Sequence, residues 1–152
     1  MPTNETKIAR HDPVKQFSVF TENKVGRLNE FVRLLGSHNI HVMALTTMDT
    51  TDSAILRVVV DDPEGARALF HEHGFPFNES DLLVVEMDSE ADLKRVLAAL
   101  LEAEINIHYI YAFIYRPHQR TALAMNIEDV DLAAHALRHH GFTVLTQGDI
   151  SR

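Results

Sequence analysis

The chain has 152 residues, of which 45% are hydrophobic and 24% are charged, as in a soluble globular protein. Its formal net charge of -8 argues against a nucleic-acid partner, because phosphate binding needs clustered Lys and Arg. It has no Cys, which excludes disulfides and thiolate metal sites and fits the cytoplasm. No apolar run approaches the roughly 18 residues of a transmembrane helix, so we expect no membrane contact.

The elements expected along the chain follow from apolar periodicity and from turn residues. Residues 1–14 are polar, lack the apolar core of a secretion signal and are predicted to form a flexible arm. The first half then predicts a strand at 16–21, a helix at 25–38, strands at 40–48 and 54–60, a helix from 63 to about 73 and a short strand from 75. The second half predicts a strand at 82–87, a helix at 89–103, strands at 105–115 and 120–127, a helix at 129–140 and a strand at 142–147.

The second half of the chain repeats the apolar pattern of the first, and such a repeat decides the fold before any single element does. At an offset of 65 residues, the apolar stripe of one helix coincides with that of its counterpart: Leu28, Phe31, Val32 and Leu35 match Leu93, Val96, Leu97 and Leu100. At an offset of 67 residues, the beginning and end of the next helix coincide: Asp62, Ala66, Gly74 and Phe75 match Asp129, Ala133, Gly141 and Phe142. The chain is therefore one motif written twice.

Two β-α-β-β-α-β copies predict an α+β fold, with two ferredoxin-like modules side by side and antiparallel sheets. We place module 1 at residues 15–79 and module 2 at 80–149, joined at 78–81 by a segment too short for a flexible linker. Residues 82–87 are apolar on both faces except at Glu86, so the second face of the sheet should be covered by the other module or by another subunit.

The loop before the first helix and the strand after it resemble ACT domains, which are small regulatory modules that bind amino acids. The loop reads N-K-V-G-R-L, in which Gly26 and Leu28 keep the family's glycine and apolar residue, while its usual proline is replaced. The following strand opens with Ile40-His41-Val42 in module 1 and with Ile105-Asn106-Ile107 in module 2, close to the family's Val/Ile-Asn-Ile. The resemblance covers residues 16–147 as a tandem pair. It implies a ligand held between two modules, touching the loop of one and the second strand of the other.

This loop is the first candidate for ligand contacts. The N–H groups of a first helical turn have no intrahelical partner and lie at the positive end of the helix dipole, so they can hold a carboxylate. Gly26 has no Cβ to block a ligand, and Asn23 offers both a donor and an acceptor to an amino acid. The predicted contacts are Asn23, Lys24, Val25, Gly26, Arg27 and Leu28. The alternative is structural: Gly26 allows tight packing and Asn23 caps the helix.

Module 2 begins its helix differently, with Asp88-Ser89-Glu90-Ala91-Asp92. Ala91 stands where module 1 has glycine, and Ser89 with Asp92 is typical of a capping box. The three carboxylates would repel a ligand carboxylate, so we expect only module 1 to bind with its loop. By the resemblance, the opposite wall of the site would be Asn106 and His108, which share one face of their strand. Alternatively, Asn106 only satisfies a backbone group at the strand end.

All three tyrosines lie on one face of the strand at 105–115, together with Ile107 and Phe113: Tyr109, Tyr111 and Tyr115. Such a stripe is typical of a core or a subunit interface, because tyrosine packs its ring and keeps its hydroxyl hydrogen-bonded. We favour a homodimer that buries this stripe. A floor for an aromatic ligand is the alternative.

The ten histidines leave a metal-binding alternative open. Four of them lie at predicted helix ends, where they suit the helix dipole and lack the i, i+4 spacing of paired ligands: His71, His73, His139 and His140. A histidine-based metal-sensing ACT-like protein is the second hypothesis, with His41, His108 and His118 as its ligands. A pure protein-interaction module is a further alternative.

The sequence thus predicts a non-catalytic regulatory protein that binds a small amino acid without a metal or cofactor. No Ser/His/Asp order, phosphate-binding glycine loop or pair of catalytic carboxylates stands out. The expected partners are a second copy of the chain and a separate enzyme of amino-acid metabolism.

Overall fold

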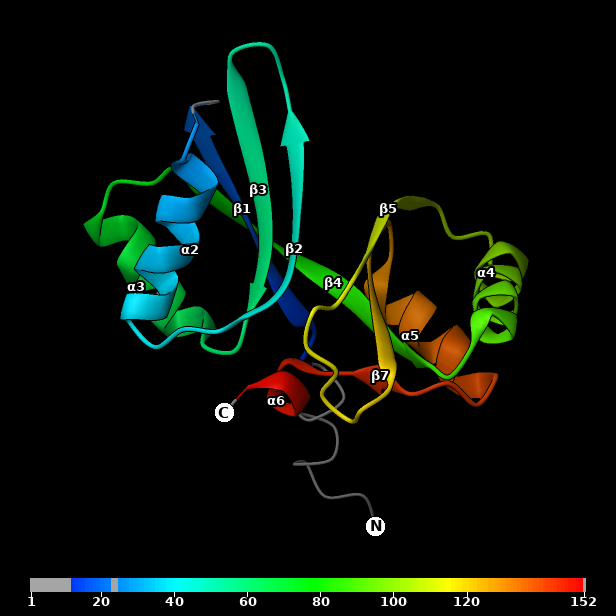
Figure 1. Ribbon diagram of the computed structural model, residues 1–152. Helices are drawn as coiled ribbons and strands as arrows, with labels where there is room; N and C mark the ends of the chain where they lie inside the picture. The colour runs from blue at the N-terminus through cyan, green and yellow to red at the C-terminus, as the bar shows by residue number, and fades with distance from the viewer. Residues whose placement is uncertain (1–11, 23–24, 152) are drawn as a thin grey trace.

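The computed structural model describes residues 12–22 and 25–151, which form seven strands and five helices (Figure 1). In chain order the elements are β1 (Val14–Glu22), α2 (Arg27–Ser37), β2 (Val42–Asp49), β3 (Ser53–Val60), α3 (Pro63–Glu72), β4 (Phe77–Met87), α4 (Glu90–Glu102), β5 (Ile107–Ala112), β6 (Thr121–Ile127), α5 (Val130–His139), β7 (Val144–Leu145) and α6 (Gln147–Ile150). The repeated β-α-β-β-α-β order predicted from the sequence is confirmed.

The second helix of each module begins and ends in the same way. Asp62 caps α3 and Asp129 caps α5, each by accepting a hydrogen bond from the backbone N–H three residues later, at 3.1 and 3.0 Å. Each helix is followed by a glycine in the left-handed conformation, Gly74 with φ 69° and Gly141 with φ 86°. The sequence repeat therefore encodes matching helix limits in both modules.

One long strand, β4, belongs to both modules. Its first half, 77–82, pairs antiparallel with β1, and its second half pairs antiparallel with β6 and with β7. The strand order is β2-β3-β1-β4 in module 1 and β5-β6-β4-β7 in module 2, so each module has the ferredoxin-like order. The segment predicted as a join, 78–81, lies inside this strand, because pairing with β1 extends it. The predicted limit between the modules, at 79 and 80, falls within β4 as well.

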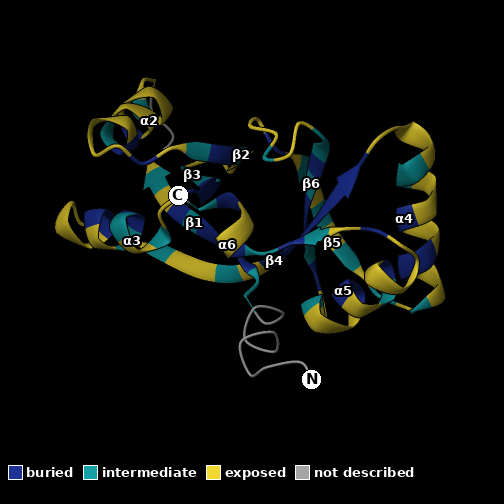
Figure 2. Ribbon diagram, turned by 90° about the horizontal axis from the view of Figure 1, so that it is seen from below, coloured by how far each residue is buried: buried dark blue, intermediate teal, exposed yellow. Residues whose placement is uncertain are grey.

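The two modules lie side by side with their helices outward and their sheets facing each other (Figures 1 and 2). Helices α2 and α3 cover the outer face of one sheet, over a core in which the Phe70 ring lies 5.4 Å from those of Phe17 and Phe31. Helices α4 and α5 cover the other sheet over a second core, which includes Leu83 and Leu100.

A third core fills the space between the two sheets and confirms that each module covers the second face of the other. Its buried residues come from both modules and include Val14, Ala44, Val59, Leu82, Val84, Phe113 and Leu145. At one place the outer edges of the sheets meet, where Ala44 and Phe113 form an antiparallel bridge. Burial on both faces explains why 82–87 is almost continuously apolar.

Tyr109 and Tyr111 cross the space between the sheets and reach Gln16 of β1, which is 1% exposed. The Gln16 side-chain amide donates to the Tyr109 hydroxyl at 2.6 Å, and the Tyr111 hydroxyl donates to Gln16 Oε1 at 2.5 Å. Burial raises the pKa of Tyr111, so its hydroxyl stays a donor. Arg57 lies over the Tyr109 ring at 4.1 Å. We predicted the tyrosine stripe at a homodimer interface, but Tyr109 and Tyr111 make their contacts within one chain because the two sheets face each other. Tyr115 lies beyond the end of β5 and is exposed.

The described chain closes with α6, where the sequence predicted a strand at 142–147. Only Val144–Leu145 pair with β4. The buried Gln147 then turns to module 1: its Oε1 accepts from the Lys15 N–H at 3.0 Å, and its Nε2 donates to the Val60 carbonyl at 3.3 Å. Helix α6 therefore fastens the end of module 2 onto β1 and β3.

The polar arm predicted at 1–14 falls mostly on residues 1–11, which lie outside the described residues. Asp12 accepts hydrogen bonds from the backbone N–H groups of Gln147 and Gly148, at 2.9 and 2.8 Å. Val14 is buried as the first residue of β1. The last three residues of the predicted arm thus belong to the folded structure. None of the helices in 12–22 and 25–151 is long and apolar enough to cross a membrane.

Candidate functional site

The predicted ligand loop connects β1 to α2 at one end of module 1 (Figure 1). Asn23 and Lys24 lie outside the described residues. Gly26 is the N-cap residue of α2 and has φ 87°, a conformation that other residues adopt only with strain. Among the described residues no side chain caps α2, so the N–H groups of its first turn lack a side-chain acceptor there. Val25 is fully exposed and Leu28 is partly exposed.

A pocket of about 230 Å³ lies directly beside this loop. It is formed by the end of β1, the first turns of α2 and the segment after α3, through Thr21, Arg27, Glu30, Phe31, Leu34, His73 and Phe75. Of the predicted site residues, Arg27 lines this pocket. Its guanidinium forms an ion pair with Glu30 one turn along the helix, with Nη1 and Oε2 3.3 Å apart. Phe31, Leu34 and Phe75 supply apolar surface.

The hydroxyl of Thr21 is the unusual polar group of this pocket. Its oxygen is buried and has no hydrogen-bond partner among the residues that the structure describes. A buried polar group without a partner costs about 1–3 kcal/mol, so such groups are rare in native structures. A polar atom of a ligand would be stabilised there if a local movement exposed the hydroxyl, because its oxygen has almost no accessible surface.

The chemistry of the pocket suits a small zwitterion. Arg27 can pair with a carboxylate and Glu30 with an ammonium group, while the apolar side chains accept a short hydrocarbon side chain. The volume of 230 Å³ is below the about 300–1,000 Å³ of sites for drug-sized ligands, so the pocket fits a small molecule.

The matching region of module 2 is arranged differently. The ion pair of α4 is reversed, with Asp92 in the place of Arg27 and Arg95 in the place of Glu30, at 3.3 Å. Arg95 lies over the Phe142 ring at 4.7 Å and donates to the His140 carbonyl at 3.4 Å. His140 and Phe142 correspond to His73 and Phe75, so the Arg95 side chain crosses the place where module 1 has its pocket.

At the start of α4 in module 2, a side chain of the helix itself forms a hydrogen bond with the backbone just before it. Asp92 accepts a hydrogen bond of 2.8 Å from the backbone N–H of Asp88, which holds the pKa of the Asp92 carboxyl below its usual range. The Ser89 hydroxyl makes no capping bond, so the part of the predicted capping box that Ser89 should supply is wrong. The Asp92 carboxylate accepts from the N–H of Asp88, one residue before the N-cap.

Strand β5, which contains His108 and directly follows Asn106, belongs to the other module from the predicted loop (Figure 1). No contact among the described residues brings them to Val25, Gly26, Arg27 or Leu28. Asn106 donates to the Glu128 carboxylate at 3.2 Å, and its carbonyl accepts from the Glu128 N–H at 3.2 Å. The matching pair of module 1 is His41 and Asp61, with the same backbone bond at 3.1 Å. His108 is exposed on β5.

The three histidines of the metal hypothesis form no common cluster among the residues that the structure describes. His41 Nδ1 is 2.8 Å from the buried Asp61 carboxylate, and His118 Nδ1 contacts the buried Glu86 carboxylate, which also pairs with Arg120. Within the described part of the chain, no group of three or more His, Cys, Asp or Glu side chains could hold a metal ion. Each of these two histidines has a single acidic partner instead.

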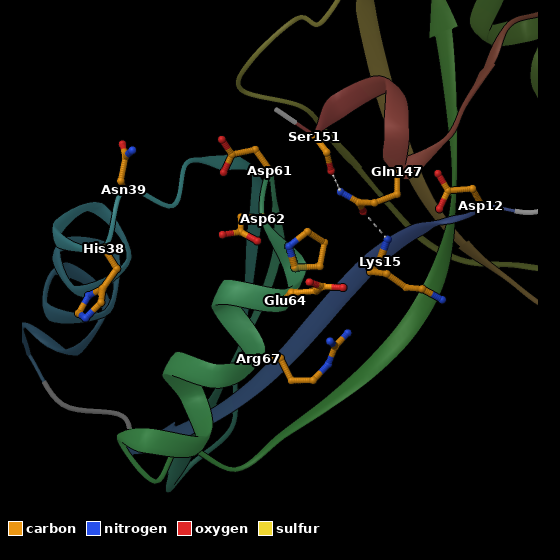
Figure 3. Close-up of a pocket in the computed structure, with 11 residues that line it drawn as sticks. Asp12, Lys15, His38, Asn39, Asp61, Asp62, Glu64, Arg67, Gln147 and Ser151 are labelled. Atoms are coloured by element: carbon orange, nitrogen blue, oxygen red, sulfur yellow. Dashed lines mark hydrogen bonds between the residues drawn. The ribbon is translucent and has the colours of Figure 1, made fainter. Parts of the chain in front are cut away.

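A larger groove of about 680 Å³ lies between α3 and α6 and is strongly acidic (Figure 3). Three of its four carboxylates already serve the fold: Asp12 accepts from the Gly148 N–H, Asp61 from His41, and Asp62 caps α3. Its cations are paired as well, Lys15 with Asp81 and Arg67 with Glu79. In this groove we therefore see structural contacts rather than a prepared ligand site.

Comparison with known proteins defines the family. The family model described as an ACT domain pair matches residues 13–139, which is most of the chain. The chain belongs to this family. The resemblance drawn from the loop and the repeat is thereby confirmed. A comparison with curated proteins gives no significant match.

Solved structures support the fold. The ACT pair is similar to protein BT0572 from Bacteroides thetaiotaomicron, with 27% identity, a TM-score of 0.84 and coverage of 94% of this chain and 99% of that one. It is also similar to the regulatory subunit of aspartate kinase from Thermus thermophilus, with 14% identity, a TM-score of 0.59 and coverage of 88% and 94%. The corresponding subunit from Thermus flavus matches with 14% identity, a TM-score of 0.52 and coverage of 84% and 92%.

Proposed function

We propose that this ACT pair is a regulatory protein that binds a small amino acid in the pocket beside α2 of module 1. The observation that carries the proposal is the pocket itself, where a charge pair of both signs stands beside apolar surface and a buried hydroxyl without a described partner. Arg27 would hold the ligand carboxylate together with the first N–H groups of α2, and Glu30 would hold its ammonium group. Membership of the ACT pair family and the likeness to a regulatory subunit support a regulatory role.

We propose further that the protein is not an enzyme. The only hydroxyl that lines the pocket belongs to Thr21, and no base lies within hydrogen-bond reach of it among the described residues. A nucleophile needs such a base to be activated. The pocket is therefore suited to recognition, and any regulated enzyme of amino-acid metabolism would be a separate chain.

A thermal-shift screen of the common amino acids, followed by isothermal titration of those that raise Tm, tests the ligand. An amino acid present at 100 times its Kd should stabilise the fold by about 2.7 kcal/mol. Arg27→Gln should weaken that binding about 10- to 100-fold, because it removes the charged partner of the carboxylate. Arg95→Gln is the matched control, since it makes the same change in the ion pair of module 2 and should leave the affinity unchanged.

Thr21→Val gives a second, independent measurement. It should weaken ligand binding while leaving the free energy of unfolding of the free protein equal or higher, because the lost hydroxyl has no described partner. If no amino acid raises Tm, or if Arg95→Gln weakens binding as much as Arg27→Gln, the proposed site is wrong.

We also propose that the functional form is a homodimer. Asn106 and His108 could reach a ligand beside α2 only from a second subunit, because they lie on the other module. Leu28 and Val32 are exposed one turn apart on α2, and Val25 is exposed in the loop before it, which offers an apolar surface next to the pocket. Sedimentation analysis of Val32→Asp should show loss of the dimer, whereas Leu132→Asp on α5 should not change it. A monomeric wild-type chain in the presence of the ligand would contradict this part of the proposal.

A further inference from the structure

A second groove, of about 620 Å³, opens where the two modules meet beside α6. Three segments far apart in the sequence line it: the beginning of β2 in module 1, the connection after β5 in module 2, and the end of α6. It lies next to the bridge between Ala44 and Phe113, where the sheet edges meet. It shares no lining residue with the pocket beside α2.

One wall of this groove is apolar, and its backbone is held in place by hydrogen bonds. The N–H groups of Ile114 and Tyr115 both donate to the Met43 carbonyl, at 2.8 and 3.4 Å. Their side chains are nevertheless 68% and 58% exposed. Val42 and Ile150 continue the apolar lining. Exposed apolar side chains that line a concave surface and are held by hydrogen-bonded backbone are typical of a preformed binding site.

The polar part of the lining is acidic. Asp61 is only 4% exposed, its Oδ1 accepts from the His41 N–H at 2.7 Å, and its Oδ2 lies 2.8 Å from His41 Nδ1. Asp149 adds a second carboxylate, which accepts from the Thr146 N–H at 2.8 Å. Neither Lys nor Arg lines the groove within the described part of the chain. A carboxylate that is shielded from water attracts a cation more strongly than an exposed one does.

We propose that this groove binds a small organic cation, in which a primary ammonium group is attached to an apolar body. The ammonium group pairs with the exposed Asp149 carboxylate, while the buried Asp61 carboxylate, held by His41, adds negative charge behind it. The apolar body packs against Ile114 and Tyr115, where the tyrosine ring also favours a nearby cation. A ligand carboxylate finds neither Lys nor Arg among the described residues of the groove, so amines bind in preference to zwitterionic amino acids.

The position of the groove gives such a ligand an effect on the pair of modules. The amine contacts β2 of module 1, residues 114–117 of module 2 and α6, so it stabilises their mutual arrangement. The two pockets share no lining residue. The pocket beside α2 is proposed to bind a ligand carboxylate, whereas this groove disfavours one, so the two sites are independent.

The test compares three ligands of nearly equal shape in isothermal titrations with the full chain: isopentylamine, isopentanol and isovalerate. Isopentylamine should bind on the order of tenfold tighter than isopentanol, because its ammonium group makes a charge-assisted contact. Isovalerate should show no binding. In amide NMR spectra, isopentylamine should shift the resonances of Met43, Ile114 and Tyr115. Binding of isovalerate as tight as that of isopentylamine would overturn the proposal.

Two variants separate this groove from general surface binding. Ile114→Ser removes apolar surface but keeps the backbone bond to Met43, and Asp149→Asn removes the charge while its amide oxygen can still accept from Thr146. Each should weaken isopentylamine binding severalfold. Leu101→Ser removes an exposed apolar side chain from α4 and should leave the affinity unchanged. Equal weakening by Leu101→Ser, or resonance shifts centred on the pocket beside α2, would refute the site.

Discussion

The hydroxyl of Tyr111 in module 2 donates to the side-chain oxygen of Gln16 in module 1 at 2.5 Å, in the space between the two sheets. This polar contact lies in a mainly apolar layer and joins one sheet to the other. The amide end of the same glutamine donates to the Tyr109 hydroxyl at 2.6 Å and to the Ser80 hydroxyl at 3.3 Å, so both ends of Gln16 have partners. A buried and fully satisfied side chain of this kind favours one relative placement of the sheets over sliding alternatives.

Tyr111→Phe should therefore lower the free energy of unfolding by about 1–3 kcal/mol, because it leaves a buried acceptor of Gln16 without its donor. Urea unfolding measures this difference. Tyr115→Phe is the control, since Tyr115 is mostly exposed, and its effect should stay within about 0.5 kcal/mol. Equal effects of the two changes would mean that the contact with Gln16 does not stabilise the pair.

Two glycines of the same helical region should respond to alanine with opposite signs. Gly26→Ala should lower the free energy of unfolding by about 1–2 kcal/mol, because Gly26 has φ 87°. Gly36→Ala should raise it by up to about 1 kcal/mol, since Gly36 lies within α2 and a Cβ there meets nothing within 4 Å. Denaturation of both variants by urea checks the pair, and a stabilising Gly26→Ala would contradict the backbone geometry of the loop.

The equivalent N-cap residues of α3 and α5 should contribute equally to stability. Asp62→Ala and Asp129→Ala should each lower the free energy of unfolding by about 1 kcal/mol, because each removes the acceptor for a first-turn N–H group. Ser89→Ala should change it by less than about 0.5 kcal/mol, since the Ser89 hydroxyl makes no capping bond. Thermal unfolding of the three variants distinguishes them. A large loss in Ser89→Ala would show that this hydroxyl caps α4 in solution.

The ion pair of Arg67 and Glu79 should be visible in the pH dependence of stability. The hydrogen bond from Arg67 holds the pKa of Glu79 below its ordinary value of 4.5. Because the folded pKa is lowered, the pair contributes stability above pH 4.5 and loses it as the pH falls through the folded pKa. The contribution should be no more than about 1 kcal/mol, because both side chains are partly exposed.

Carboxyl NMR titration measures the Glu79 pKa directly. Arg67→Met should return it toward 4.5. Arg95→Met is the control, because Arg95 pairs with Asp92 and has no contact with Glu79 among the described residues. An unchanged Glu79 pKa in Arg67→Met would show that the ion pair does not form in solution.

Regular apolar spacing made most of the elements predictable. The helix expected at 25–38 is α2, and that expected at 129–140 is α5, each within two residues of its predicted limits. The continuity of β4 was not predictable from composition, because Asn78, Ser80 and Asp81 are turn-forming residues. Their pairing with β1 overrides that local preference, as strand formation commonly depends on neighbours.

The pocket was predictable only in its local part. The loop and Arg27 follow from the pattern around Gly26, and Glu30 could have been added from its i, i+3 spacing to Arg27. His73 and Phe75 come from beyond the end of α3, and only the packing of that segment against α2 brings them there. The reversed ion pair of module 2 was readable in the sequence, but the path of Arg95 across Phe142 was not.

Strand β4 closes the sheet of one module and opens that of the next, so the two halves share a single hydrogen-bonded backbone. A hinge between them would have to break ladder bonds, whereas a change in the twist of this strand leaves those bonds intact. A ligand that changed the twist of β4 in one module would thus also change the twist of the same strand in the other module. Dividing the chain within β4 would leave each fragment with an incomplete sheet, whose edge has unpaired backbone groups and is prone to aggregation.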